Sequence, residues 1–129
     1  MDTITTNGVK ISVEVAYQPQ AELFDNENRN IFAYQITIQN LNPFDVKLLR
    51  RHWHICNGLG IRREVEGAGV IGEQPIISPD GSHQYVSYCP IITEIGKMYG
   101  TFLMKNLEDD TFFRVDIPEF IMLTPEKLN

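Results

Sequence analysis

The sequence predicts an all-β domain, a sandwich of about seven to eight antiparallel strands. Three observations support this fold class. Apolar and polar residues alternate with a period of two over much of the chain, which is the pattern of half-buried strands. Glycine, proline, asparagine and aspartate separate these stretches at short intervals, and no stretch has the apolar period of an amphipathic helix. The 129 residues suffice for a single domain, residues 1–129, whose core we expect at about residues 9–123.

The strands follow one another in a regular order. The first covers residues 9–17, where apolar side chains occupy every odd position, and the second runs from Phe32 to Ile38 with apolar even positions. After a turn at Asn42 and Pro43, a third strand covers residues 46–55 and places Trp53 between the two sheets. Further strands are expected at residues 61–66, 83–89, 98–105 and 112–117, with an eighth at 120–123.

Residues 51–67 form a predicted hairpin whose register follows from the hydrophobic pattern. A three-residue loop at residues 58–60 sets Trp53 opposite Val65, whereas a slip of one residue would set Trp53 against Glu64. A glycine of this loop is expected at positive φ. The chosen register also pairs Ile55 with Arg63, His54 with Glu64, and His52 with Glu66.

This register gathers two histidines and two glutamates on one outward face of the hairpin, namely His52, His54, Glu64 and Glu66. Histidines two positions apart on a strand point to the same side and are close enough to share a metal ion. Two interpretations are open. The face is a surface site for a divalent cation, or it is a solvated polar face with modest cross-strand pairs.

The glycine run from Gly67 to Gly72 has the Gly-x-Gly-x-x-Gly spacing of a dinucleotide-binding turn. Such a turn has to open a helix whose first N–H groups face the phosphates. Because Pro75 and Pro79 follow within a few residues, we expect no helix here. The run is either part of an anion site or a tight crossing loop beside arginines that offset nearby glutamates. The candidate anion-binding residues are Arg50, Arg51, Arg62, Arg63, Gly67, Gly69 and Gly72.

Composition argues against several classes of protein. A formal net charge of −6 and a pI near 4.9 oppose nonspecific binding to nucleic acid. The sequence has neither a run of about 18 apolar residues nor a secretion signal, so we expect no membrane span and a cytoplasmic location. Cys56 and Cys89 are expected to be free thiols, and the acidic residues 108–110 a solvated turn. No motif of a nucleophilic catalyst is present.

A set of short motifs spans nearly the whole chain, from about residue 9 to residue 123. It comprises Phe32-Ala33-Tyr34, Arg51-His52-Trp53, the glycine run followed by Gln74-Pro75, Gly96-x-Met98-x-Gly100, and Phe113-x-Val115-x-Ile117-Pro118-x-Phe120. With these residues in this order, the chain resembles the ApaG family. The resemblance implies a fold similar to immunoglobulin-like and fibronectin type III sandwiches. It also implies a link to cobalt and magnesium efflux or resistance, and a role in interactions, because related domains in F-box proteins and a polymerase-interacting protein are interaction modules.

We therefore expect a cytoplasmic, non-enzymatic binding module without catalytic residues, whose partner is another protein or a second copy of itself. Nucleic acid is not expected as a partner. The association with Co²⁺ or Mg²⁺ homeostasis would be indirect, and a divalent cation is the one cofactor considered. The alternative is a phosphate- or nucleotide-binding protein that uses the glycine loop and the neighbouring arginines.

Overall fold

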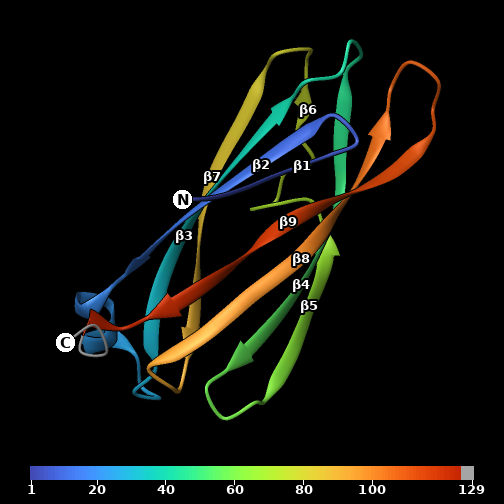
Figure 1. The fold of residues 1–129 in the computed structure, drawn as a ribbon. Coiled ribbons are helices and arrows are strands. Elements are labelled where there is room, and N and C mark those ends of the chain that lie inside the picture. Colours follow the sequence, from blue (N-terminus) through green and yellow to red (C-terminus); the bar gives the residue numbers. More distant parts are fainter. Residues whose placement is uncertain (126–129) are drawn as a thin grey trace.

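Two antiparallel β-sheets pack face to face in the computed structural model of this chain, which describes residues 1–125 except the side chains of residues 22–24 (Figure 1). The strands are β1 (Asp2–Thr6), β2 (Val9–Tyr17), β3 (Asn30–Asn40), β4 (Val46–Asn57), β5 (Arg62–Ala68), β6 (Ile76–Ile77), β7 (Ser82–Ile91), β8 (Ile95–Asn106) and β9 (Phe112–Leu123); a short 3₁₀ helix, η1, covers Pro19–Phe24. One sheet has the order β1-β2-β3-β7. The other has the order β5-β4-β8-β9, and β6 pairs with β4 outside that path. The predicted all-β sandwich is confirmed.

The described residues contain more strands than the sequence predicted, nine in place of about seven to eight. Strand β1 was not predicted because residues 2–6 are mostly exposed, so that no apolar side of the strand marks it. Strand β9 is continuous where two strands were expected. The pairing of β8 with β9 shifts between Met98 and Gly100, and the extra residue falls at Pro118 and Glu119, so a bulge accommodates the proline. Residues 126–129 lie outside the described residues.

The core lies between the sheets and is built from the inward side chains of the alternating strands. Trp53 is 2% exposed, which confirms its predicted place between the sheets. Its ring meets Tyr34 of the opposite sheet edge to face at 5.4 Å and Phe120 of β9 at 6.0 Å. Aromatic pairs at these distances add to the free energy gained from apolar burial. The aromatic cluster therefore fixes the inner face of β4, and with it the direction of the side chains on the outer face.

The hairpin of β4 and β5 has the register that the sequence predicted. Trp53 pairs with Val65, Ile55 with Arg63, His54 with Glu64, and His52 with Glu66. The loop is held by a hydrogen bond from Gly60 N to Asn57 O at 3.1 Å, and Gly60 has a φ of +79°. All four candidate metal-binding residues therefore occupy the outer face of adjacent strands.

No helix follows the glycine run within residues 1–125. Val70 and Glu73 exchange backbone hydrogen bonds of 2.8 and 3.0 Å across a two-residue turn. The turn residues Ile71 and Gly72 have φ values of +47° and +74°, as a type I′ hairpin turn requires. Gly69 is needed for a close approach, because a Cβ atom there would meet Glu73 O at 2.0 Å. The Gly-x-Gly-x-x-Gly spacing therefore belongs to a tight hairpin turn.

Cys56 and Cys89 are free thiols, as predicted. Within residues 1–125, no helix has the length and apolar character needed to span a bilayer.

Candidate functional site

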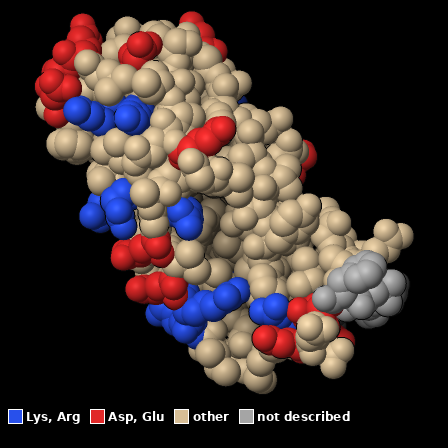
Figure 2. Space-filling model, turned by 180° about the vertical axis from the view of Figure 1, so that it is seen from behind, with Lys and Arg blue, Asp and Glu red and all other residues tan. Residues whose placement is uncertain are grey.

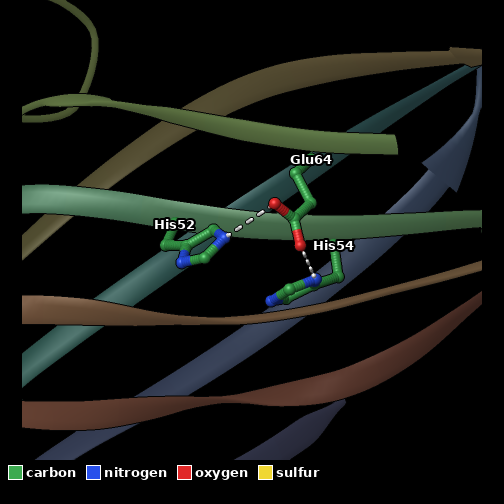
Figure 3. A group of neighbouring side chains, drawn as sticks. All are labelled: His52, His54 and Glu64. Atoms are coloured by element: carbon green, nitrogen blue, oxygen red, sulfur yellow. Dashed lines mark ion pairs between the residues drawn. The ribbon is translucent and has the colours of Figure 1, made fainter. Parts of the chain in front are cut away.

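Three side chains converge on the outer face of the five-stranded sheet. His52 and His54 come from β4, and Glu64 comes from the adjacent edge strand β5 (Figure 3). The strand period of two directs both imidazoles outward, because Trp53 between them points into the core. The two rings are 4.5 Å apart, and the Glu64 carboxylate lies between them. The site is therefore fixed by backbone register rather than by loop conformation.

The donor atoms of this group lie close enough to share one ion. His52 Nε2 is 3.7 Å from one carboxylate oxygen of Glu64, and His54 Nδ1 is 3.3 Å from the other. One donor atom from each residue lies within 4.8 Å of the other two. Both nitrogens are buried and have no hydrogen-bond partner in the described chain, since the carboxylate is at ion-pair distance without hydrogen-bond geometry. Two buried nitrogens at the same place thus have ion-pair contacts with Glu64 but no hydrogen bond.

Glu66 contacts the other side of the first imidazole. Its carboxylate lies 3.1 Å from His52 Nδ1. With a proton on Nδ1 beside the Glu66 carboxylate, the lone pair of His52 would remain on Nε2, which faces Glu64. Histidines that bind metals commonly have such a carboxylate partner, which sets the tautomer and the ring orientation. Glu66 therefore orients His52, and it lies outside the group of three whose donor atoms converge.

Tyr99 of β8 covers the second imidazole. Its ring is stacked on His54 with centroids 4.9 Å apart and planes 12° from parallel. The tyrosine hydroxyl in turn accepts a hydrogen bond from Arg62. Tyr99 could not be identified from the sequence, because it pairs with His54 only through the separate pairing of β4 with β8. The stacked ring restricts the motion of His54 and shields one side of it from water.

The donor set fits transition-metal ions better than magnesium. Ligands about 2.0–2.1 Å from a tetrahedral ion lie roughly 3.3 Å apart, close to the two observed separations. Imidazole nitrogen with one carboxylate suits Co²⁺ and Zn²⁺. Magnesium prefers an octahedral shell of oxygen atoms, and two of the three donors here are nitrogen. Of the two cations considered from the sequence, cobalt fits these residues and magnesium does not.

The four arginines proposed for anion binding do not share a site. Arg62 bonds to Tyr99 on the outer face, whereas Arg63 donates to the carbonyl of Pro90 at 2.9 Å. Arg50 is exposed. Only Arg51 lies against the glycine run, where its Nη1 donates to the carbonyls of Ala68 and Gly69, both at 3.1 Å. The guanidinium group packs over Gly67, so a Cβ atom there would lie 2.9 Å from Nη1.

The acidic residues 108–110 form the turn between β8 and β9. Asp109 accepts hydrogen bonds from the backbone N–H and hydroxyl of Thr111, and these bonds lower the pKa of Asp109. Lys105 lies 3.3 Å from Asp110. Within the described residues, the one group of three potential metal ligands is His52, His54 and Glu64.

The edge next to the histidines is strongly charged. Groups of acidic and basic side chains lie along the edge that carries β5, whose first five residues are Arg62-Arg63-Glu64-Val65-Glu66 (Figure 2). Charges on an edge strand oppose pairing with the edge of another sheet. The charged side chains of β5 therefore disfavour extension of the sheet at this edge.

Comparison with known proteins gives consistent results for sequence and fold. Residues 20–106 match the ApaG domain family. The chain is 40% identical over 128 residues to Protein ApaG of Brucella suis biovar 1 (strain 1330), which covers 98% of this chain and 96% of the relative. The putative ApaA protein from Bordetella pertussis has a crystal structure with a TM-score of 0.82 and 33% identity, over 91% of this chain and 94% of that one. The X-ray structure of a Northeast Structural Genomics Consortium target has a TM-score of 0.87 and 36% identity, over 98% of this chain and 94% of that one.

Proposed function

This chain belongs to the ApaG domain family, and on that premise we propose that it is a non-enzymatic binding module that holds one divalent transition-metal ion between His52, His54 and Glu64. The observation that carries the proposal is the pair of buried imidazole nitrogens, His52 Nε2 and His54 Nδ1, which converge on one carboxylate and have no hydrogen-bond partner among the described residues. A bound ion would satisfy both nitrogens at once.

A simple polar face explains these contacts less well. Buried polar atoms in folded proteins nearly always have a partner, and leaving one unpaired costs about 1–3 kcal/mol. Here two nitrogens without a hydrogen bond lie side by side at ion-pair distance from Glu64, and Glu66 contacts the opposite nitrogen of one imidazole. Exposed cross-strand ion pairs need none of this geometry.

The proposed ion is of the Co²⁺ or Zn²⁺ type. The resemblance to the ApaG family links the chain to cobalt and magnesium, and the nitrogen donors favour the first of these. We propose that any role in cobalt homeostasis is indirect, through binding of the ion and through contact with another protein or a second copy of the chain. The two free thiols are consistent with the cytoplasm as the proposed compartment.

The test is a titration of tag-free protein with CoCl₂, followed by the visible absorption of bound Co²⁺ and by the melting temperature. We expect saturation at one ion per chain, and at a hundredfold excess of the ion over its Kd a stabilisation of about 2.7 kcal/mol. MgCl₂ at the same concentration should produce no comparable stabilisation. His54→Gln should weaken Co²⁺ binding at least about tenfold, because one of three ligands is lost.

The matched control is His83→Gln, which removes the third histidine of the chain from a different sheet. This variant should bind Co²⁺ like the natural protein. Equal loss in both variants, or no binding of Co²⁺ and Zn²⁺ to the natural protein, would reject the metal site and leave the polar face as the explanation.

A further inference from the structure

A second site lies on the opposite side of β4, between the two sheets at their open edge. It is a cavity of about 170 Å³ bounded by Arg51 and Trp53 of β4, by Tyr34, Tyr85 and Ser87 of the other sheet, and by the turn at residues 70–72. These residues come from four separate stretches of chain and enclose a mainly polar space. The cavity is distinct from the histidine face, because Trp53 points inward where His52 and His54 point outward.

The cavity contains a positive charge without a negative partner. Arg51 donates hydrogen bonds to the backbone carbonyls of Ala68 and Gly69. None of the ion pairs in residues 1–125 involves Arg51. Arg51 lies two positions before Trp53 on a regular stretch of β4 and therefore shares its side of the strand. A charge that is partly removed from water is stabilised by an opposite charge within contact distance. The cavity therefore favours an anion.

A second donor in the cavity also has no partner. The Tyr85 hydroxyl is buried and makes no hydrogen bond within the described part of the chain. Burial of such a group without an acceptor is unfavourable. An oxyanion in the cavity would supply the missing acceptor, and it would do so beside the Arg51 charge.

The wall next to these donors contains a strained residue. Ile71 is β-branched, yet it has a φ of +47°, a region that such residues rarely occupy. Its neighbour Gly72 continues the same turn. Strained backbone of this kind tends to occur where a ligand is held. Through this turn the glycine run lines the cavity, although no helix follows it as a dinucleotide site would require.

We propose that this cavity binds a small oxyanion of phosphate or sulfate size, with Arg51 as the charge partner and Tyr85 as a hydroxyl donor. The cavity volume of about 170 Å³ is well above the roughly 10–15 Å³ that a cavity needs to hold one water molecule. Pockets that enclose drug-sized ligands measure about 300–1,000 Å³, so the base and sugar of a nucleotide do not fit inside. We therefore narrow the nucleotide hypothesis from the sequence to binding of an oxyanion group, and we leave Arg50, Arg62 and Arg63 out of the site.

The test uses inorganic phosphate at constant ionic strength, balanced with chloride and with a chelator present so that no divalent ion contributes. Trp53 is the one tryptophan of the chain and lines the cavity, so its fluorescence reports binding directly. We expect a saturable change in fluorescence and a rise in melting temperature with phosphate or sulfate. Arg51→Met should weaken binding at least tenfold, and Arg50→Met, the matched control, should bind like the natural protein.

A second variant distinguishes weaker phosphate binding from a loss of folding. Tyr85→Phe removes the unpartnered hydroxyl, so the ligand-free protein should be at least as stable as the natural one while phosphate binds several-fold more weakly. The proposal is overturned if phosphate acts no differently from chloride, if Arg51→Met and Tyr85→Phe bind normally, or if ATP binds through Arg51 and phosphate does not. Because the assay contains no metal, its failure leaves the Co²⁺ proposal untouched.

Discussion

Glu64 and Glu66 differ in role although both face the histidines. Glu64 reaches the buried nitrogens of both imidazoles, whereas Glu66 contacts His52 Nδ1 at 3.1 Å. Loss of charge should reduce the affinity for Co²⁺ more at a residue that binds the ion than at a residue that only orients a histidine. The structure therefore allows the two carboxylates to be separated by experiment.

We predict that Glu66→Gln lowers the affinity for Co²⁺ about tenfold without abolishing binding, the typical effect of losing an outer carboxylate. The affinity should be measured by calorimetry on the natural protein and on the variant. Glu73→Gln, which removes an exposed carboxylate from the turn after the glycine run, serves as the control and should leave the affinity unchanged. A loss as complete as that of His54→Gln would mean that Glu66 is itself a ligand.

Single residues also mark the limit of sequence reasoning about the sites. The histidine face could be predicted, because alternation and the three-residue loop define the register of one local hairpin. The cavity could not be predicted from the sequence. Tyr34 and Tyr85 reach Arg51 only through the packing of separate sheets, which local alternation does not specify. Nonlocal contacts of this kind require coordinates.

Among the strands, the pairing of β4 with β8 fixes the backbone of β4 that carries the two histidines. Gly100 lies opposite Trp53 at the point where β8 adjusts its register to β9. A Cβ atom at this position would meet the carbonyl oxygen of His52 at 2.1 Å, a backbone atom that cannot rotate away. The two strands could accept a side chain here only by separating.

We therefore predict that Gly100→Ala lowers the free energy of unfolding by about 2 kcal/mol or more, near the upper part of the range for forced overpacking. It should also weaken Co²⁺ binding, because His52 moves with its backbone. Gly72→Ala is the comparison, since its Cβ atom would meet nothing within 4 Å and only its φ of +74° is unfavourable. That variant should lose about 1 kcal/mol in urea unfolding. Equal stability of Gly100→Ala and the natural protein would contradict the close approach.

The prediction of elements succeeded where one face of a strand is buried. Strand β2 has the predicted bounds because its core-facing positions alternate with polar ones. Strand β1 is exposed along most of its length, so the sequence carries no such signal. Strands were predicted at residues 112–117 and 120–123, whereas the structure has one strand, because a bulge opposite Met98 and Gly100 accommodates Pro118 within it.

Across the whole molecule, the central strand β4 separates the two proposed sites. Its outer side chains face a metal site at the charged edge, and its inner side chains face both the core and the anion cavity. The net charge of −6 gives no indication of this arrangement, since the cavity depends on one unpaired arginine inside an acidic protein. Composition thus describes the average surface, while the packing of the sheets creates the local site.

Packing of the sheets also buries three groups that resist losing a proton. Burial raises the pKa of Cys89 above its ordinary 9.0, and it raises the pKa values of Tyr34 and Tyr85 above their ordinary 10.0. In the unfolded chain these groups ionise from about pH 9, whereas in the folded protein they remain neutral. The unfolded state binds fewer protons in this range, so the free energy of unfolding falls as the pH rises. This stability is fully present below pH 9 and is lost as the pH rises toward the raised folded pKa values.

We predict a loss of about 1 kcal/mol or more between pH 8.5 and 10.5, since each unit of pKa difference corresponds to about 1.4 kcal/mol. Urea unfolding at several pH values measures it. Cys89→Ala and Tyr85→Phe should each make the dependence on pH shallower, because each removes one buried acid. Tyr88→Phe changes an exposed tyrosine three residues from Tyr85 on the same strand and should leave the dependence unchanged. A free energy of unfolding that stayed constant to pH 10.5 would show that these side chains are accessible to hydroxide, and the closed packing around Trp53 would then be wrong.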